Sequence, residues 1–243
     1  MMSDSFPMEV YLVTGANRGI GLALTRVLLA SGKLVIAGCR NPDAAAGLKQ
    51  VAREYPDAID LINCDVANEQ ALQSVAEEVR KRRSNLDVIV NNGAIMPEQG
   101  NESILQIDLG LFSKAFDTNV LGQVRVIRAF YPMLIASRRP RIVNLSSGLG
   151  SISDREGYDY YAYATSKAAL NMLTRSLAFE LGPNGVTTVA ISPGWVRTDM
   201  GGQDAPLSPE QSAEALAATI EKLGPAHNGK FLSRDGKAGE YLW

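Results

Sequence analysis

The sequence has few of the residues that metal sites and hydrolytic triads use. It contains one histidine, His227, and two cysteines, Cys39 and Cys64, which lie 25 positions apart without a C-x-x-C spacing. A zinc cluster needs several such ligands, and a Ser-His-Asp triad needs a histidine beside its nucleophile. We therefore expect no metal site and no such triad, and we interpret the two cysteines as reduced core residues.

Strong net charge and long apolar runs are also missing. Lysine and arginine number 24 against 26 acidic residues, the net charge is −2 and the sequence pI is about 5.6. The basic clusters at 80–83 and 138–139 fall near predicted helix ends, where positive charge is favourable in any case. No run of 18 apolar residues occurs, and residues 1–7 lack an apolar signal segment. We expect no nucleic-acid surface, no membrane segment and a cytoplasmic location.

What the sequence does contain is an alternation of strand and helix patterns. Short apolar runs predict strands at 9–14, 34–38, 58–64, 86–90, 141–146, 186–191 and 229–236. Helical patterns lie between them, at 22–30, 42–55, 68–83, within 108–136, after Tyr163 and from Ser208. Such alternation predicts an α/β fold with one doubly wound, mostly parallel sheet covered by helices on both faces. We expect a single domain over residues 1–243.

The first predicted strand runs directly into a glycine-rich turn, Gly15-Ala-Asn-Arg-Gly-Ile-Gly21, before an apolar helix. Glycines at such a corner allow a pyrophosphate to approach the N–H groups at the helix N-terminus. The alternative is that they only shape a tight corner. Because the strand and the helix are both present, we favour a nucleotide-binding turn.

The second predicted strand ends at Arg40, where an NAD enzyme would carry an acid for the ribose 2′-hydroxyl. Arg40 together with Arg18 from the glycine turn suits a 2′-phosphate instead. We therefore expect NADP(H) rather than NAD(H). Alternatively, Arg40 only occupies a loop, with Asn41 and Pro42 starting the next helix.

Tyr163 and Lys167 lie four residues apart in a predicted helix, so their side chains share one face. A neighbouring ammonium favours the phenolate, which makes Tyr163 a candidate proton donor, although such a pair also occurs by chance. Ser147 follows the strand at 141–146, where a hydroxyl faces the ligand crevice of an open sheet. Ser146 is its competitor, because only one of two successive side chains can point into the site.

Several motifs occur in an order that resembles one enzyme family. They are T-G-x-x-x-G-x-G from Thr14, N-N-G-A at 91–94, F-D-T-N-V-L-G at 116–122, I-V-N-x-S-S at 142–147, Y-x-x-x-K at 163–167 and P-G-W-V-R-T at 193–198. Together they resemble the short-chain dehydrogenase/reductase family, which has a Rossmann-type fold. The P-G-W-V-R-T-D-M-G-G run and the F-L-x-x-D-G ending are similar to the small carbonyl reductases grouped with sniffer and the bacterial C-factor.

The resemblance implies roles for particular residues. Asn119 would open its helix locally and hold a water, Ser147 would hold the carbonyl oxygen, and Lys167 would lower the pKa of Tyr163 and bind the nicotinamide ribose. The implied cofactor-binding residues are Gly15, Asn17, Arg18, Gly19, Ile20, Gly21, Arg40, Asp65, Val66, Asn92, Gly93, Ala94, Tyr163, Lys167, Pro193, Gly194, Val196 and Thr198. Gly93 and Ala94 stand in the reverse of the family's usual order. Asp65 could equally be a turn residue.

The resemblance implies an NADPH-dependent reductase of ketones or aldehydes, with a cofactor half at about 1–140 and a catalytic half at about 141–243. Ile95, Met96, Leu149 and Trp195 are the candidate substrate contacts, and the loop at 151–160 would shape the substrate entrance. It also implies a homodimer or homotetramer. The alternative function is an NADP(H)-binding signalling or sensor protein with little turnover. An epimerase of the same fold is disfavoured, because the chain leaves little room for a sugar-binding domain.

Overall fold

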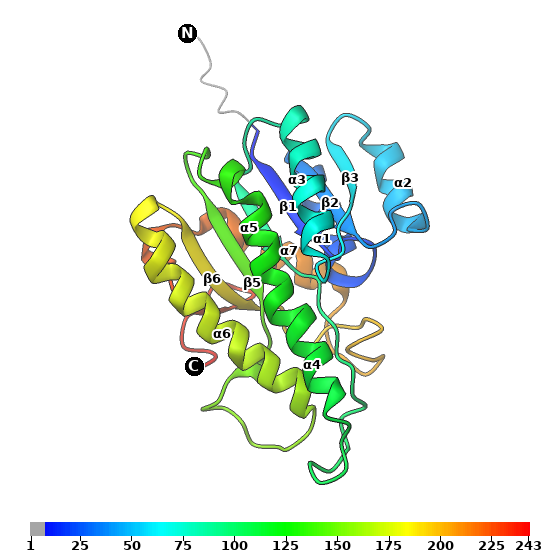
Figure 1. Ribbon diagram of the computed structural model, residues 1–243, viewed down its shortest axis with the longest axis vertical. Coiled ribbons are helices and arrows are strands. Elements are labelled where there is room, and N and C mark those ends of the chain that lie inside the picture. The colour runs from blue at the N-terminus through cyan, green and yellow to red at the C-terminus, as the bar shows by residue number, and fades with distance from the viewer. Residues whose placement is uncertain (1–7) are drawn as a thin grey trace.

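A computed structural model describes residues 8–243, and a sheet of seven parallel strands runs through its centre (Figure 1). The strands are β1 (Val10–Thr14), β2 (Leu34–Cys39), β3 (Ile59–Asn63), β4 (Val88–Asn91), β5 (Arg141–Leu145), β6 (Thr187–Ser192) and β7 (Phe231–Ser233). Their order is β3-β2-β1-β4-β5-β6-β7, and each adjacent pair is parallel. The predicted doubly wound sheet is therefore confirmed.

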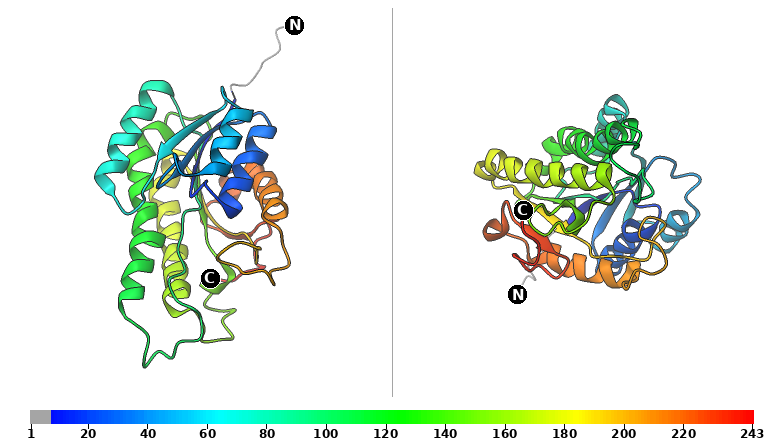
Figure 2. Two further views of the ribbon diagram at one scale, coloured as in Figure 1. Left: turned by 90° about the vertical axis from the view of Figure 1, so that its right-hand side faces the viewer. Right: turned by 90° about the horizontal axis from the view of Figure 1, so that it is seen from below.

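Helices cover both faces of this sheet, as the view from below makes plain (Figure 2). They are α1 (Gly19–Ala30), α2 (Ala46–Glu54), α3 (Glu69–Arg82), α4 (Gly110–Phe116), α5 (Gly122–Leu134), α6 (Tyr161–Leu181) and α7 (Pro209–Lys222). Side chains of β1 alternate between the faces: Tyr11 and Val13 pack with α1, α2 and α7, whereas Val10 and Leu12 pack with α3 and α5. No helix within residues 8–243 has the length and apolar character to cross a membrane.

Three helices depart from the predicted boundaries, and α1 begins at Gly19, three residues before its predicted start at residue 22. The helix predicted from Pro42 begins only at Ala46, because the Asn41 side chain accepts a 3.2 Å hydrogen bond from the Ala44 N–H and closes a non-helical turn first. The long pattern at 108–136 is divided into α4, a π-helical turn at Asp117–Leu121, and α5. The predicted start of α7 is confirmed, with a capping box between Ser208 and Gln211.

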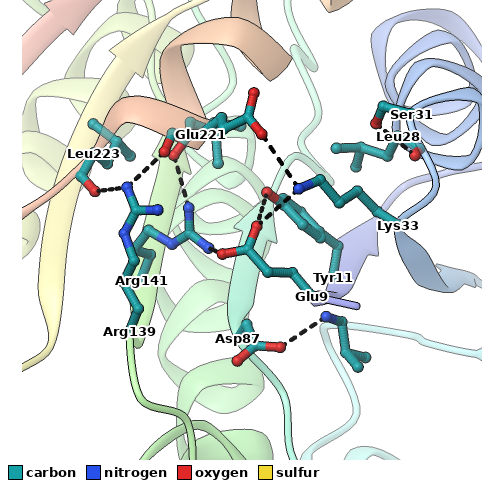
Figure 3. Close-up of polar contacts among 12 residues, drawn as sticks. Glu9, Tyr11, Leu28, Ser31, Lys33, Asp87, Arg139, Arg141, Glu221 and Leu223 are labelled. Carbon is teal, nitrogen blue, oxygen red and sulfur yellow. Dashed lines mark hydrogen bonds and ion pairs between the residues drawn. The ribbon is translucent and has the colours of Figure 1, made fainter. Parts of the chain in front are cut away.

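A charged cluster joins the amino-terminal ends of the strands to the end of α7 (Figure 3). Arg141 is fully buried, pairs with Glu9 and donates a 3.0 Å hydrogen bond to the Ile220 carbonyl oxygen. Lys33 lies 3.3 Å from a carboxylate oxygen of both Glu9 and Glu221. Because these charged groups are paired with one another, they connect the strand ends to α7 within the molecule. The predicted functional motifs lie at the other end.

Candidate active site

The predicted site residues gather at the carboxyl edge of the sheet. The glycine turn follows β1, Asn92 to Ala94 follow β4, Ser147 follows β5, and Pro193 and Gly194 follow β6. Strand order reverses between β1 and β4, so this edge holds the crevice in which open α/β sheets bind ligands.

The backbone of the glycine turn leaves no room for a side chain at Gly15 or Gly21. Gly15 and Gly19 have φ values of 64° and 52°, and a Cβ at Gly21 would lie 2.3 Å from the Gly15 carbonyl oxygen. Arg18 is the N-cap of α1 but makes no side-chain cap hydrogen bond, and the first turn of α1 carries no acid. A close backbone approach at a helix N-terminus that has no side-chain cap suits a pyrophosphate. The residues present therefore fit a dinucleotide.

The turn after β4 is fastened to the glycine turn through Thr14. The Thr14 hydroxyl oxygen accepts hydrogen bonds from the backbone N–H groups of Asn92 (3.1 Å) and Gly93 (3.0 Å). Asn92 donates in return to the Thr14 carbonyl oxygen at 2.8 Å, and Gln123 donates to the Gly93 carbonyl oxygen at 2.8 Å. Neither Gly93 nor Ala94 takes a left-handed conformation. The reversed Gly-Ala order is tolerated because this turn does not require a glycine backbone.

The two arginines predicted for the 2′-phosphate flank the same edge. Arg40 is exposed just after β2, and the Ala16 N–H bonds the Gly38 carbonyl oxygen at 3.0 Å, which joins this strand end to the glycine turn. Arg18 forms an exposed ion pair with Asp199, on the segment after β6. The sequence did not predict that pair.

Asp65 serves as a turn residue before α3. Its carboxylate accepts a 3.1 Å hydrogen bond from the Ala67 N–H, while Asn68 is the N-cap of α3. Val66 is buried beside it, and a Cβ on Gly122 would lie 2.8 Å from the Val66 side chain. The structure thus shows the turn role of Asp65, and a cofactor contact stays a prediction.

Ser147, Tyr163 and Lys167 come together beyond the end of β5. The Lys167 Nζ lies 5.6 Å from the centroid of the Tyr163 ring and donates a 2.7 Å hydrogen bond to the Leu145 carbonyl oxygen. Ser147 lies close enough to the Tyr163 phenol to lower its pKa, and its hydroxyl oxygen accepts a 3.2 Å hydrogen bond from the Leu149 N–H. Tyr163 and Lys167 are both buried. A half-buried hydroxyl therefore lies beside a phenol and an amine that are both shielded from water.

The ionisation of this group differs from the prediction. Burial raises the pKa of Tyr163 to about 12, a Ser147 hydrogen bond opposes the rise, and the Glu98 charge adds to it. Burial also lowers the pKa of Lys167 to about 7. The Tyr163 pKa is therefore raised, not lowered, in the protein without cofactor, because burial is the largest cause and Lys167 is not among the causes. An effect of Lys167 on Tyr163 in the assembled site stays a prediction.

The two candidate serines face opposite sides. The buried Ser146 hydroxyl donates a 2.6 Å hydrogen bond to the Asn171 side chain and so points beneath α6. Ser147 is half-buried and adjoins Tyr163. This is the alternation expected of consecutive residues at a strand end. Ser147, not Ser146, lies at the crevice.

Asn119 occupies the π-helical turn between α4 and α5, where the helix is locally opened as predicted. It is fully buried, and its side chain both accepts from the Ile95 N–H and donates to the Ile95 carbonyl oxygen, each at 2.8 Å. It also donates to the Ser166 hydroxyl at 3.0 Å. Asn119 thus connects the loop after β4 to α6. Its part in a proton relay stays a prediction.

The predicted substrate residues lie around the entrance to this group. Ile95, Met96 and Leu149 are half-buried, while the Trp195 side chain is 57% exposed and donates to the Gly201 carbonyl oxygen at 2.7 Å. The loops at 95–108 and 151–160 project from the same end of the molecule (Figure 1). They meet where the Tyr160 ring packs against Gly100.

Three residues at this edge were missed by the sequence reasoning. Gln123 holds the turn after β4, Asp199 pairs with Arg18, and the buried Glu98 accepts a hydrogen bond from the Tyr163 backbone. Of the three, only Asp199 belongs to a motif quoted above, the P-G-W-V-R-T-D-M-G-G run, and no role was assigned to it there. The only sequence signal for Glu98 was its place six residues beyond Asn92.

Comparison with known proteins decides the family. The model of the short chain dehydrogenase family matches residues 9–206. This chain belongs to the short-chain dehydrogenase/reductase family. It is similar to the carbonyl reductase Sniffer of D. melanogaster (TM-score 0.92, 32% identity, 97% of this chain and 100% of that one).

Two other members are informative. An NADPH-bound carbonyl reductase from chicken fatty liver has a TM-score of 0.90 and 32% identity, over 97% of this chain and 99% of that one. The C-signal protein of Myxococcus xanthus is 38% identical over 152 residues, which are 62% of this chain and 90% of that protein. The predicted likeness to the small carbonyl reductases grouped with sniffer and the C-factor is confirmed. The chain thus belongs to an oxidoreductase family, and its fold is like that of solved carbonyl reductases.

Proposed function

We propose that this protein reduces a ketone or aldehyde with NADPH, and that Tyr163 donates the proton to the carbonyl oxygen. The observation that carries the proposal is the assembly of Ser147, Tyr163 and Lys167 beside a glycine turn that fits a dinucleotide. When bound, the cofactor would supply the hydride. The chain's own residues would hold the carbonyl and provide the proton.

Tyr163 suits proton donation because it stays protonated. With its pKa raised to about 12 by burial, the phenol is intact across neutral pH. The alkoxide that develops during carbonyl reduction is a stronger base than a phenolate, so the proton would pass from Tyr163 to substrate. The Ser147 hydroxyl would donate a hydrogen bond to the same oxygen as its negative charge grows.

Lys167 and Asn119 would support proton donation by Tyr163 without contacting the carbonyl oxygen. Lys167 is held toward the end of β5 by Leu145 and has a pKa lowered to about 7, so it can exchange a proton near neutral pH. We assign it to the nicotinamide ribose and to resupply of protons to Tyr163. Asn119, in the opened helix turn, would position the water of that relay.

Arg18 and Arg40 support a preference for NADPH. Both are exposed at the edge where the adenosine end of a dinucleotide would lie, and guanidinium groups favour a 2′-phosphate. The similarity to an NADPH-bound carbonyl reductase agrees with this assignment. Ile95, Met96, Leu149 and Trp195 would then form an apolar entrance for a small carbonyl substrate.

The test is the initial rate of NADPH and NADH consumption with aromatic ketones, quinones, dicarbonyls and aldehydes, for the native protein and for Tyr163→Phe. We expect turnover with NADPH and a loss of about 10²–10⁴-fold in kcat for Tyr163→Phe, with the NADPH Kd nearly unchanged. Full turnover by Tyr163→Phe would refute Tyr163 as the donor.

The similarity to the Myxococcus xanthus C-signal protein favours a second function, in which NADP(H) binding serves a signal and turnover is minor. Tight NADPH binding without turnover on the whole panel would support it. Against it, Ser147, Tyr163 and Lys167 are assembled together, and a pure sensor has no chemical use for this group.

A further inference from the structure

Glu98 is an acidic residue enclosed beside the group just described. It is 5% exposed and is the one buried residue between 92 and 100, in the loop that follows β4. Its Oε1 accepts a 2.6 Å hydrogen bond from the backbone N–H of Tyr163, in the first turn of α6. A carboxylate at a helix N-terminus satisfies a free N–H group and favours the helix dipole. Glu98 thus caps α6 from a distant part of the chain.

The loop that carries Glu98 is fastened at three successive points. Gln123 holds the Gly93 carbonyl oxygen, Asn119 holds both backbone groups of Ile95, and Glu98 holds Tyr163. The loop therefore connects the opened helix turn to the start of α6. Tyr163 is therefore held in position both by its own helix, α6, and by the loop that carries Glu98.

The hydrogen bond alone does not explain why a charged residue stands here. The second oxygen, Oε2, is buried and has no hydrogen-bond partner among residues 8–243. A buried carboxylate oxygen without a partner costs free energy, and a glutamine would offer the Tyr163 N–H the same kind of acceptor. Glu98 therefore brings a charge beside Tyr163 in addition to an acceptor for this N–H group.

We propose that Glu98 is a positioning residue for proton donation, which holds the first turn of α6 through the Tyr163 amide and places a buried carboxylate beside the residue that donates the proton. The inference rests on the proposed function and adds to it which direction of the reaction, reduction or oxidation, the site favours. A phenol held in its acid form favours reduction of a carbonyl over oxidation of an alcohol, which needs the phenolate.

The surrounding charges agree with this role. The Glu98 charge raises the pKa of Tyr163, although less than burial does. The Lys167 Nζ lies 5.6 Å from the centroid of the Tyr163 ring. In the same loop, the exposed Glu102 accepts 2.8 Å hydrogen bonds from the N–H groups of Gln99 and Gly100. Arg155 and Asp159, before α6, form an ion pair with each other. Within residues 8–243, Glu98 is the carboxylate that accepts a hydrogen bond from the Tyr163 backbone N–H.

The first experiment compares pH profiles of kcat in both directions for the native protein, Glu98→Gln and Glu102→Gln. Glutamine keeps an acceptor for the Tyr163 N–H but removes the charge. We expect the pKa that governs alcohol oxidation to fall by about 0.5–1 unit in Glu98→Gln, and oxidation at neutral pH to rise relative to reduction. Glu102→Gln is the matched control, and its profile should superimpose on the native one.

A second measurement does not depend on turnover. Tyrosinate absorbance is followed with rising pH in the cofactor-free protein, with Tyr163→Phe used to identify the Tyr163 contribution. Tyr163 should ionise at lower pH in Glu98→Gln, whereas Glu98→Asp, which keeps the charge, should remain near the native value.

If Tyr163 ionises at the same pH in folded native and Glu98→Gln proteins, the proposal is overturned. If Glu98→Gln does not fold, ionisation in Glu98→Asp at a pH below the native one by the same margin overturns it.

The two proposals fail in different ways. Full turnover by Tyr163→Phe refutes the proposed function. The titration of Tyr163 in native and Glu98→Gln proteins still tests the effect of Glu98 in that case. A lowered melting temperature in Glu98→Gln with unchanged pH profiles and unchanged titration would reduce Glu98 to a structural cap and so overturn this inference alone.

Discussion

Lys167 donates a 2.7 Å hydrogen bond from Nζ to the Leu145 carbonyl oxygen at the end of β5. This contact holds the amine under the strand edge, 5.6 Å from the centre of the Tyr163 ring. Both side chains are withdrawn from water there, and burial shifts each pKa toward the neutral form. Burial therefore shifts the protonation equilibria of Tyr163 and Lys167 in the protein alone, before any ligand binds.

The burial of Lys167 predicts how stability depends on pH. Its pKa falls from 10.5 in the unfolded chain to about 7 in the folded one, so between these values the unfolded chain binds more protons and folding becomes more favourable as pH rises. Lys167→Met removes this dependence. The difference in unfolding free energy, native minus variant, should increase from pH 7 to pH 9 by about 1 kcal/mol per pH unit. Urea unfolding at three pH values measures it.

Tyr163 confines that test to pH values below 10. Because its pKa rises from 10.0 to about 12 on folding, the folded protein keeps a proton that the unfolded chain loses, and stability falls above pH 10. Lys49→Met, on the exposed face of α2, serves as the control for removing a lysine. A native-minus-variant difference that stays flat between pH 7 and pH 9 would mean that Lys167 is not buried as the structure has it.

The parts of the fold and site that the sequence predicted depend on local patterns. The glycine turn, the strand ends and the Tyr163/Lys167 spacing are each contained in a few consecutive residues. Contacts between distant segments were not predictable in this way: Glu98 reaches Tyr163 across 65 positions, and Arg18 reaches Asp199 across 181. The pKa of Tyr163 was predicted in the wrong direction for the same reason, since spacing reveals a charged neighbour but not the degree of burial.

Ser147→Ala should lower kcat far more than Ser146→Ala. Ser147 adjoins the Tyr163 phenol, and loss of a hydrogen-bond donor to the reacting oxygen costs about 10²–10³-fold in kcat. The Ser146 hydroxyl bonds Asn171 beneath α6, so its loss should reduce stability by about 1 kcal/mol with little change in kcat. Steady-state rates and thermal melts of both variants separate the two effects. Equal losses of kcat would show that Ser147 has no special role.

Arg40→Asp should shift the cofactor preference toward NADH. A carboxylate at the end of β2 would repel a 2′-phosphate and accept a hydrogen bond from a ribose 2′-hydroxyl. The measured quantity is the ratio of kcat/KM with NADPH to that with NADH. Arg53→Asp, on α2, makes the same charge change at an exposed position that we have not assigned to the site. If the two variants alter the ratio equally, general charge and not a local contact is responsible.

Asp199→Asn should tighten NADPH binding without affecting NADH. The Arg18 guanidinium is paired with Asp199, and this pair must loosen for Arg18 to serve a phosphate. Exposed ion pairs contribute at most about 1 kcal/mol, so the NADPH Kd should fall by about two- to fivefold. Calorimetric titration of both cofactors, repeated at high salt, measures this; the gain should shrink as salt screens the charges. If the Kd for NADH changed equally, the effect of Asp199→Asn would not depend on a contact between Arg18 and the 2′-phosphate.

Gly21→Ala should destabilise the protein and weaken dinucleotide binding together. The added Cβ would lie 2.3 Å from the Gly15 carbonyl oxygen and 2.6 Å from the Asn92 side-chain nitrogen, so the backbone of the turn must move. Overpacking of this kind costs about 1–3 kcal/mol. Gly224→Ala is the matched control, because a Cβ there meets nothing within 4 Å and its φ of −159° is ordinary extended backbone. We expect the control to stay within about 0.5 kcal/mol of the native protein. A Gly21→Ala protein with native stability and native NADPH affinity would contradict the close packing between the glycine turn and Asn92.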